Sequence, residues 1–413
     1  MTSPKRIDVA LRFSDNPVPV GSLATDTRNV YFEYHPAFIE RQLHLSPFML
    51  PLTPGLQRIN DDIFNGLPGV FNDSLPDGWG KLLLHQELKQ RGINPSTLGP
   101  LDELAMVGDS GMGALTYHPA HPLDYPPGII NLDSYAAASR HVLEGHADHM
   151  LPELRAAAGS SSGARPKVLV TVSKDRSRLS TALPTTPDEE QWLVKFPTSA
   201  DGADAGAIEY VYSLMARAAG ITMEPCHLFP STSGAGYFGT RRFDRNNGDR
   251  LHVHSLSGLI HDDHRHPSFD YSGLLAVTQK ITLNPNDVQS MFRLAAFNVL
   301  AHNRDDHSKN FSFIMHTTGR WQISPAYDLT FSSGPNGFQS MSVMGEARSP
   351  TISDLKNLGS NTGIRPAAIA DILLQVSDAL TSWTQLARAH GVSQTNIALI
   401  ERTIMRNILA KAH

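Results

Sequence analysis

The feature that most constrains this chain is a polar segment, residues 302–310, with the sequence HNRDDHSKN. It places Asp305 and Asn310 five positions apart, and Asp328 follows within the sequence SPAYD. Phosphoryl transfer uses such groups, because a carboxylate must orient the attacking hydroxyl while Asn and Asp oxygens hold the Mg²⁺ that neutralises the phosphates. Taken alone, the spacing is more often that of an ordinary solvated loop. The flanking segments therefore decide between the two interpretations.

The segments on both sides of this loop have regular patterns. Residues 286–300 carry apolar side chains at helical spacing, with Asn286 as the expected cap. After the loop, residues 310–315 alternate as in a strand, and residues 319–323 fit its hairpin partner. We expect a buried helix to lead into the polar loop and a hairpin to lead from it to Asp328.

A phosphoryl-transfer site also needs backbone N–H groups over the phosphates and a lysine on a strand. Residues 159–167, GSSSGARPK, form a small-residue loop that runs into the strand-like residues 168–172. A second strand over residues 191–197 carries Lys195 in an apolar setting. Glu209 starts the next helical pattern and is a candidate partner for that lysine. A lone lysine on a strand usually lies at the surface. Here, however, the small-residue loop, the strand after it, the strand with Lys195 and the helix with Glu209 follow one another in the order that such a site uses.

With these residues in hand, the chain resembles the HipA family of bacterial toxin Ser/Thr kinases. The resemblance covers most of the length and includes, besides the loops above, the segments LPDGWG (75–80), GDSGMGAL (108–115), KFP (195–197) and RFDR (242–245). It implies an ATP- and Mg²⁺-dependent protein kinase, with Asp305 as proton acceptor and with Asn310 and Asp328 as metal ligands. The ATP site that the resemblance implies comprises Ser162, Gly163, Ala164, Arg165, Pro166, Lys167, Lys195, Arg241, Arg242, Phe243, His307, Ser308, Lys309, Asn310, Tyr327 and Asp328.

The resemblance also implies regulation and partners. Ser160 falls where the family carries an autophosphorylated loop serine, and Ser162 is a second candidate. A phosphate there would compete with ATP for the same N–H groups. The family implies a HipB-like antitoxin and a protein substrate, for which a translation factor such as an aminoacyl-tRNA synthetase is one candidate. The alternative function is a catalytically silent kinase-fold module that binds or represses with an antitoxin.

Three positions depart from the family pattern. His254 and Ser255 stand where many members carry a Glu-Asp pair, which indicates a divergent branch. Arg241 is basic where we expect an acidic residue in the hinge beside adenine. The protein substrate of better-known members is therefore not assumed here, and the nucleotide preference stays open.

Length and composition fit a cytoplasmic enzyme with two lobes. With 413 residues, 40% hydrophobic and 18% charged, the chain can bury a large core. Together with the family resemblance, this leads us to expect an α+β, protein-kinase-like bilobal fold: an accessory N-terminal region (1–120), a strand-rich nucleotide lobe (121–250) and a mostly helical lobe with the catalytic loop (251–413).

The remaining composition features bear on the compartment and on partners. No apolar run reaches membrane-spanning length, the first residues lack a signal-peptide core, and the single Cys226 suits a reducing compartment. The net charge of −5 does not favour nucleic acid, so we expect DNA contact only through the antitoxin.

Three further motif matches have simpler explanations. Residues 159–163 satisfy G-x-S-x-G, but a hydrolase elbow at Ser161 needs a strand before it and a helix after it, and the expected order is reversed. Residues 234–239 satisfy G-x-G-x-x-G, yet a tight hairpin turn explains them better. Residues 261–266, HDDHRH, could bind a transition metal, but we expect a solvated loop there.

Overall fold

The N-terminal part of the chain forms an antiparallel sheet. The computed structural model describes residues 4–26, 29–121, 127–146, 151–158, 163–246 and 248–409. The sheet has the strand order β4-β3-β2-β1-β5, with β1 (Arg6–Leu11), β2 (Val18–Thr25), β3 (Val30–Tyr34), β4 (Leu56–Gln57) and β5 (Leu115–His118). Alternate residues of β1 are buried, as in a strand with one face on the core. Pro19 cannot donate to the ladder, and the register shifts opposite it between Val9 and Ala10.

Short helices connect the strands of this N-terminal part. They are α1 (Pro36–Ile39), α2 (Gly69–Asn72), α3 (Gly78–Gln90), the 3₁₀ turn η1 (Pro95–Thr97) and α4 (Pro100–Val107). The predicted helix around residues 79–89 is confirmed as α3.

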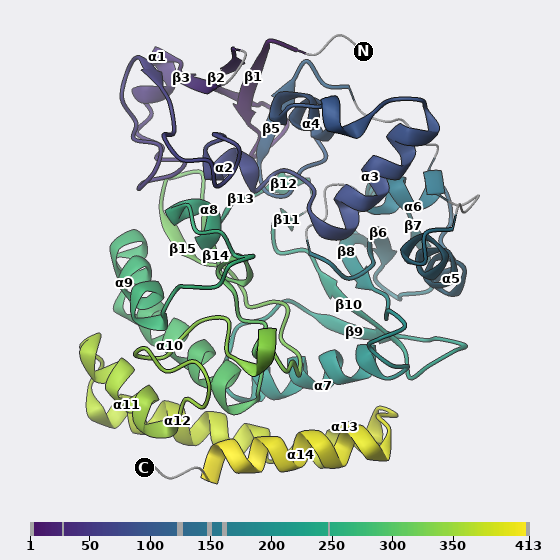
Figure 1. The fold of residues 1–413 in the computed structure, drawn as a ribbon, viewed down its shortest axis with the longest axis vertical. Coiled ribbons are helices and arrows are strands. Elements are labelled where there is room, and N and C mark those ends of the chain that lie inside the picture. Colours follow the sequence, from purple (N-terminus) through teal and green to yellow (C-terminus); the bar gives the residue numbers. More distant parts are fainter. Residues whose placement is uncertain are drawn as a thin grey trace.

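A second five-stranded sheet lies in the middle of the molecule (Figure 1). Its order is β7-β6-β8-β10-β9, with β6 (Lys167–Ser173), β7 (Leu179–Ser180), β8 (Glu189–Lys195), β9 (Cys226–Phe229) and β10 (Tyr237–Arg241). One face packs on side chains of α3, α5 (Leu132–Leu143) and α6 (Leu151–Ala158). Helix α7 (Ala205–Ala218) packs against β9 and β10. The sheet thus carries its two lysines, Lys167 and Lys195, at the ends of neighbouring strands.

The C-terminal part is mostly helical. After the β11 (Arg245–Asn246) and β12 (Asp249–Arg250) ribbon, a three-stranded sheet joins β13 (His252–Ser255), β14 (Ser312–Met315) and β15 (Trp321–Ile323). The helices are α8 (Leu256–Ile260), α9 (Tyr271–Thr282), α10 (Pro285–Leu300), η2 (Ser308–Asn310), η3 (Pro335–Gly337), α11 (Ile352–Asn361), α12 (Pro366–Leu380), α13 (Trp383–Ala389) and α14 (Gln394–Leu409). In Figure 1 the last four helices lie at the end of the molecule opposite the N-terminal sheet.

These observations confirm the expected α+β class, strand-rich in the first part and helical in the last. One buried apolar cluster contains Leu11 and Phe32 of the N-terminal sheet together with Phe292 of α10 and Trp383 of α13. The domain boundaries at residues 120 and 250 stay a prediction. Within the described residues, no helix combines the length and apolar character that crossing a membrane requires.

The helix that leads into the polar loop begins two residues earlier than predicted. The cap of α10 is Asn284, whose side chain accepts from the N–H of Asn286 at 3.1 Å. Pro285 occupies the first helical position, where its missing N–H costs nothing. The prediction of Asn286 as the cap is therefore wrong. The hairpin of β14 and β15 after the loop is confirmed.

Candidate functional site

Lys195 joins three elements at the centre of the predicted site. Its ammonium lies 2.5 Å from Oε1 of Glu209 on α7 and also contacts the carboxylate of Asp328. The predicted pairing with Glu209 is confirmed. Burial alone would lower the pKa of Lys195, but Asp328 and Glu209 outweigh it and hold this pKa above its usual range. Burial would likewise raise the pKa of Asp328, but the charges of Lys195 and Lys167 hold it well below its usual range.

Further cations lie beside this centre. Lys167 pairs with Lys195 in the register of β6 and β8. Burial lowers the pKa of Lys167 to about 8, and the charge of Lys195 adds to this effect. Arg165 forms an ion pair with Asp201 at 3.0 Å and interacts electrostatically with Glu209, Asp201, Asp328 and Asp305. The structure therefore places Lys195, Lys167 and Arg165, together with their carboxylate partners, where the sequence predicts phosphates.

The described part of the predicted phosphate loop runs from Gly163 to Lys167. Gly163 adopts a φ of +96°, a conformation that favours glycine. Ala164 follows it, and the carbonyl of Pro166 accepts from the N–H of Phe196 at 2.8 Å, which ties the loop to the end of β8. The predicted residues Ser160, Ser161 and Ser162 lie outside the described residues.

The polar loop after α10 presents an accessible carboxylate. Asp305 is 59% exposed, and its backbone carbonyl accepts from Nδ2 of Asn310 at 2.7 Å. This bond leaves the Asn310 amide oxygen as the group available to a cation. Partial desolvation raises the pKa of Asp305, although the nearby His307 opposes the rise. Nε2 of His307 lies 3.9 Å from the Asp305 carboxylate.

The base of this loop is fixed by a buried residue that sequence reasoning missed. Asp306 accepts from the Tyr271 hydroxyl at 2.6 Å, Nε2 of Gln339 at 3.0 Å and the N–H of Ser340 at 2.9 Å. Burial raises its pKa to about 6. These partners lie more than 30 positions away in sequence, so no local pattern signals them. Asp306 orients the loop and leaves its neighbour Asp305 facing outward.

Aromatic side chains connect the predicted hinge to the loop. The ring of Phe243 stacks on Tyr327 with centroids 5.9 Å apart. The Tyr327 hydroxyl donates to the carbonyl of Lys309 at 2.9 Å and shares a 2.6 Å hydrogen bond with Ser312. Phe243, Tyr327 and Lys309 are thus brought together as predicted site members.

Three predicted site residues have side chains engaged in other contacts. The Arg242 guanidinium forms two hydrogen bonds, of 2.9 and 2.8 Å, to the buried Asp244. The Ser308 hydroxyl donates to Asp262. Arg241, basic at the hinge, contacts Glu224 at 2.7 Å and Glu190 at 3.0 Å.

The departure at residues 254 and 255 also has a physical explanation. Nδ1 of His254 lies 2.7 Å from the carboxylate of Asp73, and Nε2 lies 3.0 Å from the hydroxyl of Ser46. The Ser255 hydroxyl donates to the other oxygen of Asp73 at 2.6 Å. Asp73, from the N-terminal part, therefore supplies an acidic group at the place where this chain lacks the family's Glu-Asp pair.

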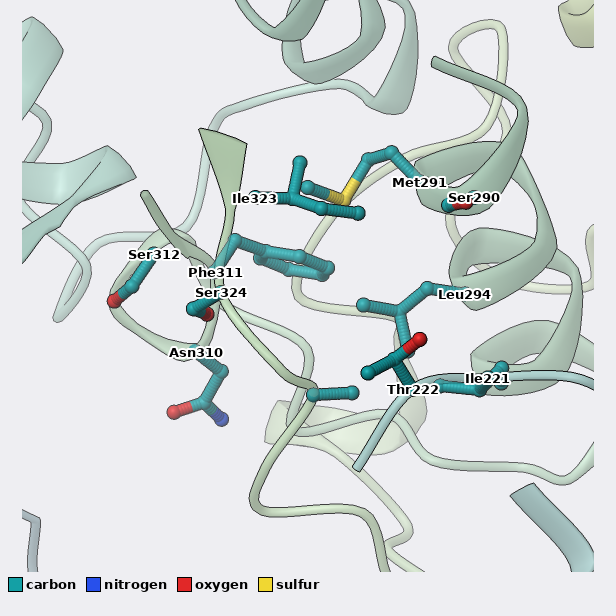
Figure 2. Close-up of a pocket in the computed structure, with 11 residues that line it drawn as sticks. Ile221, Thr222, Ser290, Met291, Leu294, Asn310, Phe311, Ser312, Ile323 and Ser324 are labelled. Carbon is teal, nitrogen blue, oxygen red and sulfur yellow. The ribbon is translucent and has the colours of Figure 1, made fainter. Parts of the chain in front are cut away.

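A small hollow lies next to the predicted site (Figure 2). Helix α10, the β14–β15 hairpin and the segment after α7 line it. Figure 2 shows the Phe311 ring turned toward Met291, Ile323 and Leu294, with the Asn310 amide turned away from them. Its lining contains Asn310 but neither Asp305, Lys195 nor Asp328. The hollow is therefore separate from the group of charged residues described above.

The elements around the two glycine-rich motifs explain both matches. Helix α6 precedes residues 159–163 and strand β6 follows them, which is the reverse of a hydrolase elbow. Residues 234–239 lie in the β9–β10 hairpin, as predicted, but the connection runs over residues 230–236 and is longer than the tight turn we expected.

For the segment 261–266, the expectation of a solvated loop is wrong at His261. This side chain is buried, and both of its ring nitrogens have partners: Nδ1 lies 2.9 Å from the carboxylate of Asp61, and Nε2 accepts from the N–H of Gly69. Across the described ranges, no three His, Cys, Asp or Glu side chains are grouped so as to hold a metal ion.

The residues present fit a hard cation held together with a nucleotide. The Asp328 carboxylate and the Asn310 amide provide oxygen ligands of the kind Mg²⁺ takes, and few protein ligands suffice when phosphates supply the others. Lys195, Lys167 and Arg165 provide the charge that a polyphosphate requires.

Comparisons with known proteins agree with this arrangement. Residues 13–118 match the family model of the HipA N-terminal domain, and residues 159–384 match that of the HipA-like C-terminal domain. The fold is similar to that of HipA from Shewanella oneidensis MR-1, solved as a complex with HipB and its operator DNA. That comparison has a TM-score of 0.69 at 16% identity, over 97% of this chain and 96% of that one.

A curated relative gives a partial sequence match. The protein named "Putative kinase Y4dM" of Sinorhizobium fredii is 25% identical over 278 residues, which are 64% of this chain. The match spans 62% of that relative's length. Since the C-terminal family model alone covers more than half of the residues, the chain belongs to the HipA family.

Proposed function

We propose that this protein is an ATP- and Mg²⁺-dependent Ser/Thr protein kinase. The observation that carries the proposal is the junction at Lys195, where one ammonium contacts both Glu209 and Asp328 beside the loop of Asp305 and Asn310. A lysine on a strand, held by a helix glutamate and adjoining a metal-ligand aspartate, is the arrangement that protein kinases use to fix ATP phosphates.

Each residue has a distinct task in this proposal. Asp305, exposed and aimed outward by the anchored Asp306, accepts the proton of a substrate Ser or Thr hydroxyl. Asp328 and Asn310 would hold Mg²⁺, which when bound would neutralise charge on the phosphates. Lys195, Lys167 and Arg165 orient the phosphates. The hydroxyl oxygen bonds to the γ-phosphorus, the bond to the β-phosphate oxygen breaks, and ADP leaves.

The family suggests a cellular role, a partner and a target for this protein. We infer that the chain acts in the cytoplasm as the toxin of a toxin–antitoxin pair. Its partner would be a HipB-like antitoxin, with DNA contacted through that partner. The solved complex of HipA with HipB and operator DNA supports this inference through likeness of fold. The target would be a protein, with an aminoacyl-tRNA synthetase as one candidate. Autophosphorylation of Ser160 or Ser162 would switch the kinase off.

One experiment tests the proposed function. The purified protein is incubated with γ-labelled ATP, Mg²⁺ and a bacterial lysate, and labelled proteins are identified by mass spectrometry. The account expects a labelled lysate protein on Ser or Thr, and phosphate on residues 160–162 of the protein itself. Absence of any labelled protein would contradict the kinase proposal and favour a catalytically silent module.

A further inference from the structure

A segment of the N-terminal part reaches into the proposed ATP site. Asp77, which immediately precedes α3, accepts a hydrogen bond from the N–H of Gly163 and contacts the ammonium of Lys309. Gly163 belongs to the phosphate loop and Lys309 to the catalytic loop. Burial would raise the pKa of Asp77, but Lys309, the Gly163 N–H and Lys167 together hold this pKa below its usual range. A single ionised carboxylate therefore links the two loops.

The residues after Asp77 hold the same stretch of loop at both ends. The N–H of Trp79 donates to the carbonyl of Gly163 at 3.0 Å, and its indole Nε1 donates to the carbonyl of Lys167 at 3.0 Å. Gly78 lies so close that a Cβ there would be 2.5 Å from the Gly163 carbonyl oxygen. Trp79 is 1% exposed. Residues 77–79 thus form a rigid support for residues 163–167.

We propose that Asp77 is a positioning residue for the nucleotide phosphates, acting through Gly163 and Lys309. The inference rests on the proposed ATP-dependent function. The Lys309 side chain has several rotatable bonds, and without the Asp77 carboxylate its ammonium loses the partner that fixes it. Without the acceptor, the Gly163 N–H is no longer held in one direction. Binding of phosphates would then have to order both groups, and this lowers affinity.

The opposite effect must also be considered. Asp77 is negatively charged, and its removal would reduce repulsion of ATP and leave Lys309 without its competing partner. A carboxylate that merely occupied the phosphate position would therefore inhibit binding. The supporting contacts favour positioning, because Trp79 donates to carbonyls of the loop and Gly78 lies close beside it, and neither contact competes with a phosphate. The two possibilities predict opposite signs for the same substitution.

The test compares ATP with adenosine, which lacks phosphates, by calorimetry in the presence of Mg²⁺. Asp77→Asn keeps an oxygen that can accept from Gly163 and removes the charge that holds Lys309. We expect ATP affinity to fall on the order of tenfold, with adenosine affinity unchanged. Trp79→Phe removes only the indole donor at the other end of the support, and should give the same selective loss to a smaller extent. Asp8→Asn, in an exposed contact with Arg6 and Ser22, is the matched control.

Each outcome has a defined meaning. Selective loss of ATP affinity in Asp77→Asn, with a wild-type unfolding temperature, supports the positioning role. Unchanged or increased ATP affinity in Asp77→Asn overturns it, and so does an equal loss for ATP and adenosine. A double variant with Lys309→Met adds a second criterion, because the effect of Asp77→Asn should shrink in that background. If the wild-type protein binds no ATP, the proposed function fails as well; if only the variant effect is missing, the proposed function stands.

Discussion

The Lys195 ammonium lies 2.5 Å from the Glu209 carboxylate while it also contacts Asp328. One side chain therefore joins the central sheet, helix α7 and the segment that follows the β14–β15 hairpin. Asp328 adopts a φ of 58°, a conformation uncommon for residues other than glycine. The contact with Lys195 thus holds the Asp328 carboxylate, the proposed metal ligand, in place.

This arrangement makes a prediction for metal dependence. Asp328→Ala and Asn310→Ala should each weaken Mg-ATP binding about tenfold or more, because each removes an oxygen ligand of the bridging cation. Calorimetry with ATP in Mg²⁺, repeated in EDTA, measures the effect. In EDTA the Asn310→Ala protein should bind ATP like the wild type. Unchanged Mg-ATP affinity in both variants would contradict the assignment of Asp328 and Asn310 as metal ligands.

A second prediction concerns pH. Burial lowers the pKa of Lys167 to about 8, so the free protein loses this charge as pH rises through that value. ATP phosphates favour the ammonium, and ATP affinity should therefore fall above about pH 8, by up to about tenfold per pH unit. Titrations between pH 7 and pH 10 would show this slope in the wild type. In Lys167→Arg the side chain stays charged, so ATP affinity should change less steeply with pH. The same slope in both proteins would contradict the assignment of this pH dependence to Lys167.

The sign of the stability effect follows from the same shift. The unfolded chain holds the Lys167 proton up to its ordinary pKa of about 10.4, whereas the folded protein releases it near 8. Between these values the unfolded state binds more protons, so this residue makes folding more favourable as pH rises through that window. Below about pH 8, where Lys167 is charged in both states, its unfavourable contribution to the stability of the fold is complete. ATP binding and this contribution to stability should therefore change in opposite directions.

The third prediction concerns the junction between the N-terminal part and the central sheet. Asp244 is fully buried, contacts Arg242 at 2.8 Å and Arg245 at 2.6 Å, and accepts from the N–H of Gly113 at 2.8 Å. Asp244→Ala leaves two guanidinium groups without this partner and should lower the free energy of unfolding by about 3–5 kcal/mol. Chemical denaturation measures this loss. The exposed Asp8→Asn change should cost no more than about 0.5 kcal/mol; equal losses in the two proteins would refute the structural role of Asp244.

The polar loop could be predicted because its signal is local. Asp305, Asn310 and the hairpin that follows lie close together in the sequence, so no distant segment is needed to bring them together. The strand position of Lys195 and its pairing with Glu209 were likewise predictable, since a single strand–helix connection separates them. The expected class of fold followed from the same alternation of patterns.

What the sequence did not reveal depends on contacts between distant segments. Asp77 meets Lys309 across 232 positions, and Asp73 meets His254 across 181. No periodicity or spacing within a short window links such residues. At α10 the error was smaller: Asn284 and Asn286 are both good caps, and Pro285 decides between them because it favours the first helical position.

The central claim is that Asp305 accepts the substrate proton in an ATP-dependent transfer to a Ser or Thr hydroxyl. The most direct test is a single-turnover assay with γ-labelled ATP and Mg²⁺ on wild-type and Asp305→Asn proteins, with labelled phosphoprotein as the readout and ATP affinity measured in parallel. The account predicts that Asp305→Asn lowers the transfer rate by about two orders of magnitude or more while ATP still binds. Transfer at a near-native rate in Asp305→Asn would contradict it.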